Sequence, residues 1–349
     1  MKAWAPSSKT THLDNLAALR RYCGGVSTRD IIAFSRLCKI YKIIEHEMCA
    51  KDWSPNTVKN WVNALTSVIK HIVPEEFKVQ WAHEIEAWEQ LHKLATKMAE
   101  EPAKEGKATE RQIAGYVPWS RILACRDALP YASKAHLIVC MWTMLPPLRL
   151  DHREVRIVRS LEDLGDWQGS YILLSGQASF LHTVRPNKVF ADAAYAGGIK
   201  AALPQQLVEV IEASLARTPR SFLFTTYSSQ DNLFTEKSYG NRVRNTLRET
   251  TGNSKIGVSI LRHIYVTAMY EHYRAALEGA HGVEAQTQAR SEVAKSAHMM
   301  AHSLSMHKLY RFDVSEEGEL IPMEGTQVTA HDIPLISAAE RNAPLSVRC

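Results

Sequence analysis

Residues 254–270, SKIGVSILRHIYVTAMY, form the stretch from which the rest of the chain can be interpreted. Its apolar residues predict a helix, and the pair Arg262–His263 lies near the start of that helix. The stretch also ends a basic segment. Residues 235–262 hold six basic side chains against two acidic ones, the basic ones being Lys237, Arg242, Arg244, Arg248, Lys255 and Arg262.

The charge of the whole chain is unevenly distributed. The formal net charge is +5, but residues 313–349 hold seven Asp or Glu against two Arg, which gives −5. Residues 1–312 therefore carry +10. A basic body with an acidic tail is typical of a protein that binds a polyanion, with a solvated helix face as the alternative.

Length and composition indicate an ordinary globular protein. The 349 residues are enough for two domains, and 45% hydrophobic with 23% charged residues is an average composition. No apolar run approaches the roughly 18–20 residues of a membrane span, and residues 1–16 lack the apolar core of a signal peptide. We therefore expect no membrane partner and an intracellular location, nucleus or cytoplasm, wherever the partner of the basic body lies. The six cysteines show no C-x-x-C spacing, which predicts reduced, packing cysteines.

The N-terminal third predicts a bundle of helices. Residues 27–48 and 54–73 show apolar residues at helical spacing, and a third amphipathic stretch covers roughly 78–98. In the second stretch Ser54 is the expected N-cap and Pro55 the first helical residue. We expect a helical domain over residues 1–98, followed by a charged linker over 99–115 that contains Pro102 and Gly106.

The remainder predicts a second domain over residues 116–312 and an acidic, extended tail over 313–349. Residues 116–145 have a helical pattern, and short β-type runs separated by turn residues follow within 153–184. Residues 204–217, with Pro204 near the start, and 236–310 again have helical patterns. The predicted fold class is mainly α, with one small antiparallel sheet in the second domain.

Common cofactor and metal motifs are missing. The sequence has no G-x-G-x-x-G, G-x-x-x-x-G-K-[ST], H-E-x-x-H or G-x-S-x-G. His298 and His302 have a spacing that can bind a metal, but no carboxylate or cysteine accompanies them. We therefore expect no metal and no cofactor.

Three stretches make chemical sense only together. LPPLRLDHREVR (145–156) contains Arg149, the opening stretch contains Arg262 and His263, and MAHSLSMHKLYRF (300–312) contains His302 and Tyr310. This order of Arg, Arg-His, His and a final Tyr resembles the tyrosine recombinases, the phage-integrase-like enzymes of DNA integration and recombination. The PPLRLD box looks closest to recombinases of eukaryotic viruses or mobile elements. The resemblance covers nearly the whole chain, with residues 1–98 as core-binding domain and 116–312 as catalytic domain.

The resemblance implies a role for each matching residue. Arg149 and Arg262 would clamp the scissile phosphate, Tyr310 would be the nucleophile that forms a 3′-phosphotyrosine, and His302 would assist at the same phosphate. A lysine of the family's β-hairpin acts as general acid, for which Lys188 is the better match and Lys200 the second. Lys59, Arg242 and Arg244 would contact DNA.

The chain departs from the family pattern at two places. Ser259 stands where the second box, H-x-x-R, has its histidine. A serine can donate a hydrogen bond to phosphate, but it is no base near neutral pH. The general base is then His302 or His263. Tyr310 follows His302 by eight residues, one fewer than usual, and Ala301 replaces a usual glycine.

The resulting hypothesis is a site-specific DNA recombinase or integrase that needs neither metal nor ATP. Its partners would be double-stranded DNA and three further copies in a tetrameric synapse, with residues 313–349 contacting a neighbouring protomer. Two alternatives stay open: an inactive DNA-binding relative of this fold, and a nicking-closing enzyme of the type IB topoisomerase kind.

Overall fold

The structure is a computed structural model, and it describes residues 6–22, 55–72, 75–80, 82–148, 151–176, 178–184, 198–226, 232–300, 302–315 and 320–321. The chain divides into two compact units, Met1–Pro102 with Met323–Cys349, and Ala103–Pro322. The helix predicted over 27–48, both Arg149 and Lys188, and the tail beyond residue 321 lie outside the described residues.

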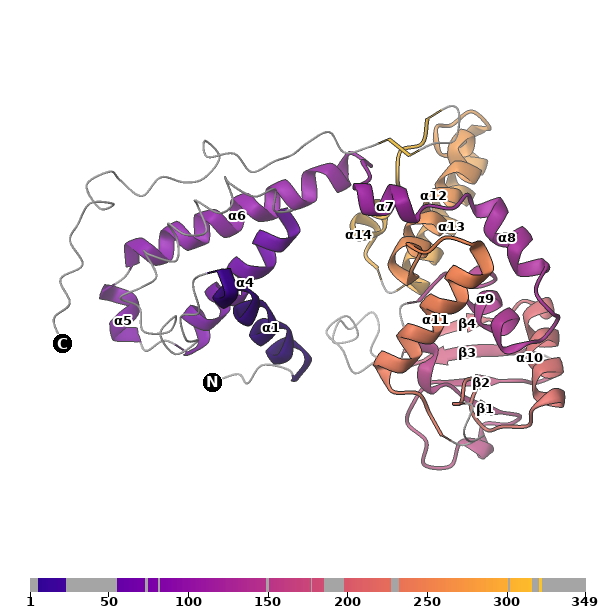
Figure 1. Ribbon diagram of the computed structural model, residues 1–349. Coiled ribbons are helices and arrows are strands. Elements are labelled where there is room, and N and C mark those ends of the chain that lie inside the picture. Colours follow the sequence, from indigo (N-terminus) through magenta and orange to yellow (C-terminus); the bar gives the residue numbers. More distant parts are fainter. Residues whose placement is uncertain are drawn as a thin grey trace. The chain divides into compact units, whose positions relative to one another are not determined.

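Helices make up the described part of the first unit: α1 (Pro6–Tyr22), α4 (Pro55–Ile72), α5 (Glu75–Gln80) and most of α6 (Ala82–Lys104) (Figure 1). The apolar stripe predicted for α4 is buried at Val58, Trp61, Val62 and Leu65, and α1 packs against this helix. Along α6, Trp88, Leu91 and Ala95 are buried at helical spacing.

The predicted linker is largely helical. Helix α6 continues to Lys104, and α7 covers Glu110–Gly115. Thr109 and Gln112 form a capping box at the start of α7: the Thr109 side chain accepts from the Gln112 amide, and the Gln112 side chain accepts from the Thr109 amide. The turn between the two helices contains Gly106 in a left-handed conformation, with φ of 71°. The domain boundaries that we expect from the sequence stay a prediction.

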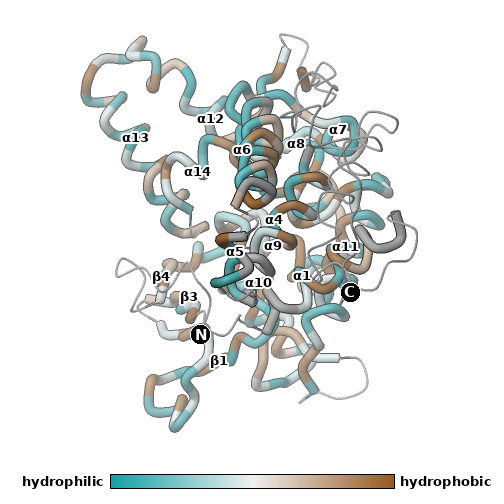
Figure 2. The backbone as a smooth tube through the Cα atoms, turned by 90° about the vertical axis from the view of Figure 1, so that its left-hand side faces the viewer, coloured by the Kyte–Doolittle hydropathy of each residue, from teal (hydrophilic) through white to brown (hydrophobic). Residues whose placement is uncertain are grey.

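The second unit is built around one buried helix, α9 (Lys134–Thr143). Every residue from His136 to Thr143 is buried, because α8 (Trp119–Asp127), α10 (Gln205–Arg217) and α11 (Glu236–Thr251) pack around this helix. A helix that is apolar on all sides belongs in the middle of a domain. Figure 2 shows the contrast with α13 (Gly282–Met299), whose hydropathy is mostly polar.

The sheet is mixed, which corrects the antiparallel sheet predicted from the sequence. Its order is β1 (Arg156–Val158), β2 (Tyr171–Leu173), β3 (Phe180–Thr183) and β4 (Ile199–Ala202) (Figure 1). β2–β3 and β3–β4 are antiparallel, but β1 and β2 are parallel. The segment between β1 and β2 contains the 3₁₀ turn η3 (Glu162–Leu164) and is long enough for the chain to cross over and enter β2 in the same direction. The mainly helical fold class itself is confirmed.

The last described segments complete the second unit. α12 (Val258–Leu277) packs on α13, and the short helix α14 (Leu304–Lys308) follows, capped by Ser303. Beyond Tyr310 the chain turns back: Val314 and Leu320 form an antiparallel bridge. Phe312 and Leu320 pack with Ala108 into a small apolar cluster. The first part of the predicted tail therefore packs against the predicted linker.

Candidate active site

Helix α12 buries the arginine of the opening stretch. Arg262 lies five residues after the N-cap Gly257 and is 2% exposed. Its Nη1 donates to the Pro147 carbonyl at 2.9 Å, and its Nη2 donates to His302 Nε2. The guanidinium thus joins two segments far apart in the sequence. One of these segments contains Pro147, which stands two residues before Arg149 in the sequence.

Tyr310 lies against the same guanidinium. Arg262 Cζ is 5.3 Å from the centroid of the Tyr310 ring. The ring of His302 lies 4.6 Å from that of Tyr310, centroid to centroid, with 30° between the planes. His302 is buried, whereas Tyr310 is partly exposed. Arg262, His302 and Tyr310 therefore form one cluster, with the tyrosine on the side open to solvent.

His263 contacts both the ring and the backbone of Tyr310. Its ring stacks on Tyr310 with centroids 4.4 Å apart, and on Phe312 with centroids 4.6 Å apart. His263 Nδ1 donates to the Tyr310 carbonyl at 3.0 Å. Burial, opposed by that hydrogen bond and assisted by the Arg262 charge, lowers the pKa of His263 to about 4. A neutral imidazole that is fixed in this way orients the tyrosine and is poorly placed to act as its base.

His307, in the stretch 300–312, is a neighbour of the cluster to which the resemblance gives no role. It lies three residues before Tyr310, is fully buried, and its ring centroid is 5.9 Å from that of His302. Neither ring nitrogen has a hydrogen-bond partner among the described residues. Burial, then the Arg262 charge, lowers its pKa to about 4. Its position within MAHSLSMHKLYRF, one turn before the tyrosine, is the signal that could have identified it.

The other predicted site residues have separate outcomes. Ser259 is exposed one helical turn before Arg262, so it is open to a ligand. Lys200 lies on β4 opposite His182, with its Nζ 5.4 Å from the centre of the Phe180 ring. His302 lies beyond the end of α13, so His298 and His302 do not face one another along one helix. Among the described residues no group of three His, Cys, Asp or Glu side chains is arranged to hold a metal.

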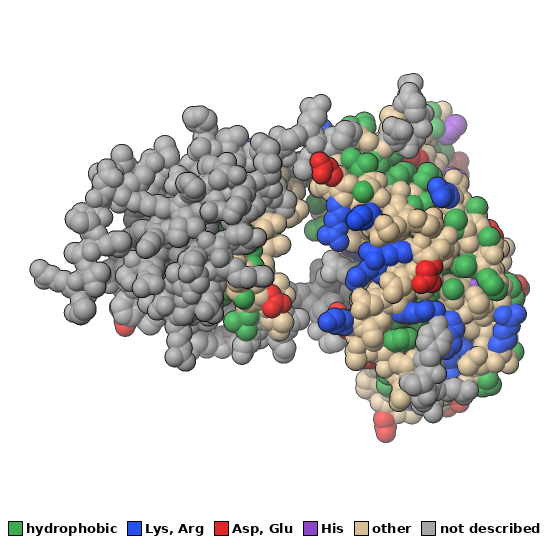
Figure 3. Space-filling model, viewed as in Figure 1, with side chains coloured by type: hydrophobic (Ala, Val, Ile, Leu, Met, Phe, Trp, Pro, Cys, Tyr) green, Lys and Arg blue, Asp and Glu red, His purple; other side chains and the backbone are tan. Residues whose placement is uncertain are grey.

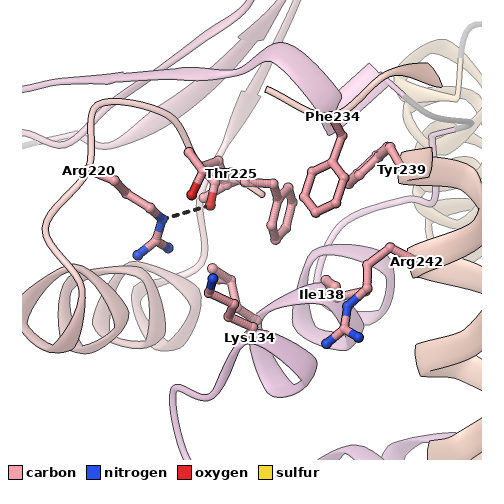
Figure 4. A pocket seen from close by; sticks show the side chains of 10 residues that line it. Lys134, Ile138, Arg220, Thr225, Phe234, Tyr239 and Arg242 are labelled. Carbon is pink, nitrogen blue, oxygen red and sulfur yellow. Dashed lines mark hydrogen bonds between the residues drawn. The ribbon is translucent and has the colours of Figure 1, made fainter. Parts of the chain in front are cut away.

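Helix α11 contributes to a basic cavity near the start of α9 (Figure 4). Lys134, Arg220 and Arg242 surround a hollow of ≈ 20 Å³ whose apolar wall includes Phe234 and Tyr239. Burial, then the charges of Arg220 and Arg242, lower the pKa of Lys134, as expected where three cations converge. The hollow holds about one water molecule, so it admits a single oxygen and no nucleobase.

The basic residues of α11 are not all equivalent. Arg244 is exposed and Arg242 lines the basic cavity. Figure 3 shows Lys and Arg side chains outnumbering Asp and Glu on the displayed face of the unit Ala103–Pro322. Lys59, in the other unit, forms an ion pair with Glu100 at 3.0 Å.

Comparison with known proteins gives matches among solved structures alone. No protein-family model and no curated protein matches the chain. Among solved structures, the chain is similar to the crystal structure of XerA recombinase, with 12% sequence identity, a TM-score of 0.38, and coverage of 88% of this chain and 95% of that chain. In the part of the chain that the structure describes, no helix is both long and apolar enough to cross a membrane.

Proposed function

We propose that the chain is a DNA strand transferase of the tyrosine recombinase kind. One observation carries the proposal: Arg262 on α12 forms one cluster of side chains with His302, which precedes α14, and Tyr310, which follows it. A buried, permanently charged guanidinium beside a partly exposed tyrosine is the minimum equipment for attack of a phenolic oxygen on a phosphodiester.

The reaction balances without a cofactor. Tyr310 Oη attacks the phosphorus of one DNA phosphodiester, and the bond from phosphorus to the 5′ oxygen breaks. The phenolic proton passes to a base, and the departing 5′ oxygen takes a proton from an acid. The products are a 3′-phosphotyrosine and a free 5′ hydroxyl. Because the new ester keeps the energy of the old one, a second 5′ hydroxyl can reverse the step on another strand.

The cluster supplies the electrostatic part of this step. Negative charge grows on the non-bridging oxygens as the phenol attacks, and Arg262 offers a rigid pair of donors for them. The bond from Arg262 to Pro147 O ties the chain near Arg149 to the same place, which supports Arg149 as the second clamp. His302 accepts from Arg262 through Nε2, so its Nδ1 carries the ring proton and can donate at the phosphate, whereas the Nδ1 proton of His263 is given to the Tyr310 carbonyl.

Double-stranded DNA is the proposed partner. The basic cavity and Arg244 provide positive charge on the same unit as the cluster, and a backbone phosphate can place one oxygen on that cavity. Strand exchange between two duplexes needs four nucleophiles, so we propose a tetramer on paired sites.

The test is adduct formation on a nicked duplex. A pool of duplexes covers the DNA that flanks the coding region, and each is nicked a few nucleotides 3′ of a candidate phosphate. After cleavage, the short downstream fragment that carries the new 5′ hydroxyl diffuses away, so that the adduct accumulates. We expect a denaturation-resistant protein–DNA adduct in EDTA. DNA binding with no adduct would identify an inactive relative, and relaxation of supercoiled DNA lacking paired sites would identify a topoisomerase-like activity. Either outcome would contradict the recombinase.

A further inference from the structure

The turn at Gly106, in the middle of the predicted linker, is buried in the second unit. Gly106 is buried and Ala108 is 0% exposed, which is unusual for a flexible spacer. The Gly106 carbonyl accepts from the Asp313 amide at 2.9 Å, and the Ala108 amide donates to the Ile321 carbonyl at 3.0 Å. Asp313 lies three residues after Tyr310. The linker therefore pairs with the chain directly downstream of the tyrosine.

The same downstream chain is fixed to α12. The Phe312 amide donates to Thr267 Oγ1 at 2.9 Å inside the core, and the Phe312 ring is nearly parallel to that of His263, at 10°. The backbone from Tyr310 to Asp313 is thus held at its first carbonyl by His263, at residue 312 by Thr267, and at residue 313 by Gly106. Little freedom is left for the tyrosine backbone.

Gln112, also in the predicted linker, is connected to Tyr310 through His263. Gln112 Nε2 lies 3.5 Å from His263 Nε2. Since His263 Nδ1 faces a carbonyl, which only accepts, Nδ1 carries the proton and Nε2 accepts from the Gln112 amide. Gln112 thereby favours the tautomer that bonds the Tyr310 carbonyl. The capping box fixes Gln112 itself.

We propose that residues 106–112 of the predicted linker position the nucleophile Tyr310. They do so by hydrogen bonding to the chain downstream of it and by fixing the tautomer of His263. This inference rests on the proposed function of Tyr310. Gly106 lies only two residues after the end of α6, a helix of 23 residues that begins in the first unit.

Gly106 is the residue at which this contact can be broken most selectively. Its φ is 71°, and a Cβ built there would lie 2.7 Å from Asp313 Cγ and 3.0 Å from Asp313 N. The second atom is backbone, so Gly106→Ala must displace the segment that follows Tyr310. Gly165→Ala is the matched control, because Gly165 also has a positive φ, 51°, but nothing lies within 4 Å of its Cβ position.

The experiment measures cleavage of the nicked duplex at saturating DNA, together with DNA affinity and thermal unfolding. A misplacement of about 1 Å can cost about 100-fold in rate. We expect Gly106→Ala to cleave at least about 10-fold more slowly with DNA affinity unchanged within about threefold, and Gly165→Ala to cleave like the wild type. Should Gly106→Ala fail to fold, the second variant decides.

Gln112→Glu is that second variant. A glutamate keeps the capping box but removes the donor to His263 Nε2. The groups around His263 are the Tyr310 and Phe312 rings, Gln112, and the positive charge of Arg262. A carboxylate faces the Nε2 lone pair unfavourably until His263 is protonated. The carboxylate also raises the pKa of His263 from its low value, so we expect slower cleavage that recovers relative to wild type as the pH falls toward about 5.

The outcomes separate this inference from the proposed function. Wild-type protein that forms no adduct overturns the proposed function, and the positioning role with it. A wild-type adduct, with Gly106→Ala cleaving within about threefold of Gly165→Ala, overturns the positioning role alone. So does a pH profile of Gln112→Glu parallel to that of the wild type.

Discussion

Replacing Arg262 by lysine separates charge from geometry at the centre of the cluster. Lysine keeps the positive charge but has one donor centre, whereas Arg262 serves the Pro147 carbonyl and His302 through two different nitrogens. One buried acceptor is then left without a donor, at a cost of about 1–3 kcal/mol. For a unit of this size we expect the melting temperature to fall by roughly 2–12 °C.

The effect on cleavage should exceed the effect on stability. Loss of one preorganised donor to the charged transition state typically costs about 3 kcal/mol or more, so Arg262→Lys should cleave at least about 100-fold more slowly at saturating DNA. The control is Arg156→Lys, since Arg156 also donates to a backbone carbonyl, that of Leu164, but belongs to β1. If Arg262→Lys cleaves within about threefold of this control, the two-nitrogen guanidinium geometry of Arg262 is not needed for cleavage.

Three further predictions concern charge and protons. His152 is fully buried against Trp142, with no hydrogen-bond partner for its ring nitrogens among the described residues, and burial lowers its pKa to about 3. Only the unfolded chain then binds this proton below about pH 6.5, so the free energy of unfolding falls on acidification. In urea unfolding, His152→Leu should reduce this fall between pH 7 and about pH 5 by about 2 kcal/mol, and an unchanged pH dependence would contradict the prediction. Arg242→Ala with Arg244→Ala should flatten the log–log salt dependence of DNA binding by about one to two units, and an unchanged slope would return α11 to a solvated face. Lys188→Ala should cleave slowly and be rescued when sulfur replaces the departing 5′ oxygen, because a thiolate leaves without a proton, whereas Lys200→Ala should cleave almost normally; the reverse result would assign Lys200 as the acid.

The local helices could be predicted because their signals are local. The stripe Val58, Trp61, Val62 and Leu65 in α4 is buried as its spacing indicates, and Pro55 begins that helix. The direction of β1 could not be predicted, because it depends on how a loop of irregular residues folds back, for which no periodic pattern exists.

The candidate site was predictable in residue type and less so in contact. The order of Arg262, His302 and Tyr310 led to the cluster that the structure contains. The partners that fix it are Pro147, Thr267 and Gly106, which act through a carbonyl, a hydroxyl and a backbone turn. Such contacts depend on tertiary approach and leave no motif, so only the folded chain reveals them.

Mapping the covalent bond to one residue tests the central claim most directly. After cleavage of the nicked duplex, the adduct is digested with protease and nuclease, and the peptide carrying the nucleotide is identified by mass spectrometry. We expect the nucleotide on Tyr310. Tyr310→Phe should lose the adduct while its DNA affinity stays within about threefold of the wild type. The control Tyr270→Phe, whose altered ring lies near His307, should keep the adduct. A phosphotyrosyl adduct that persists in Tyr310→Phe, or maps to another residue, would contradict the central claim.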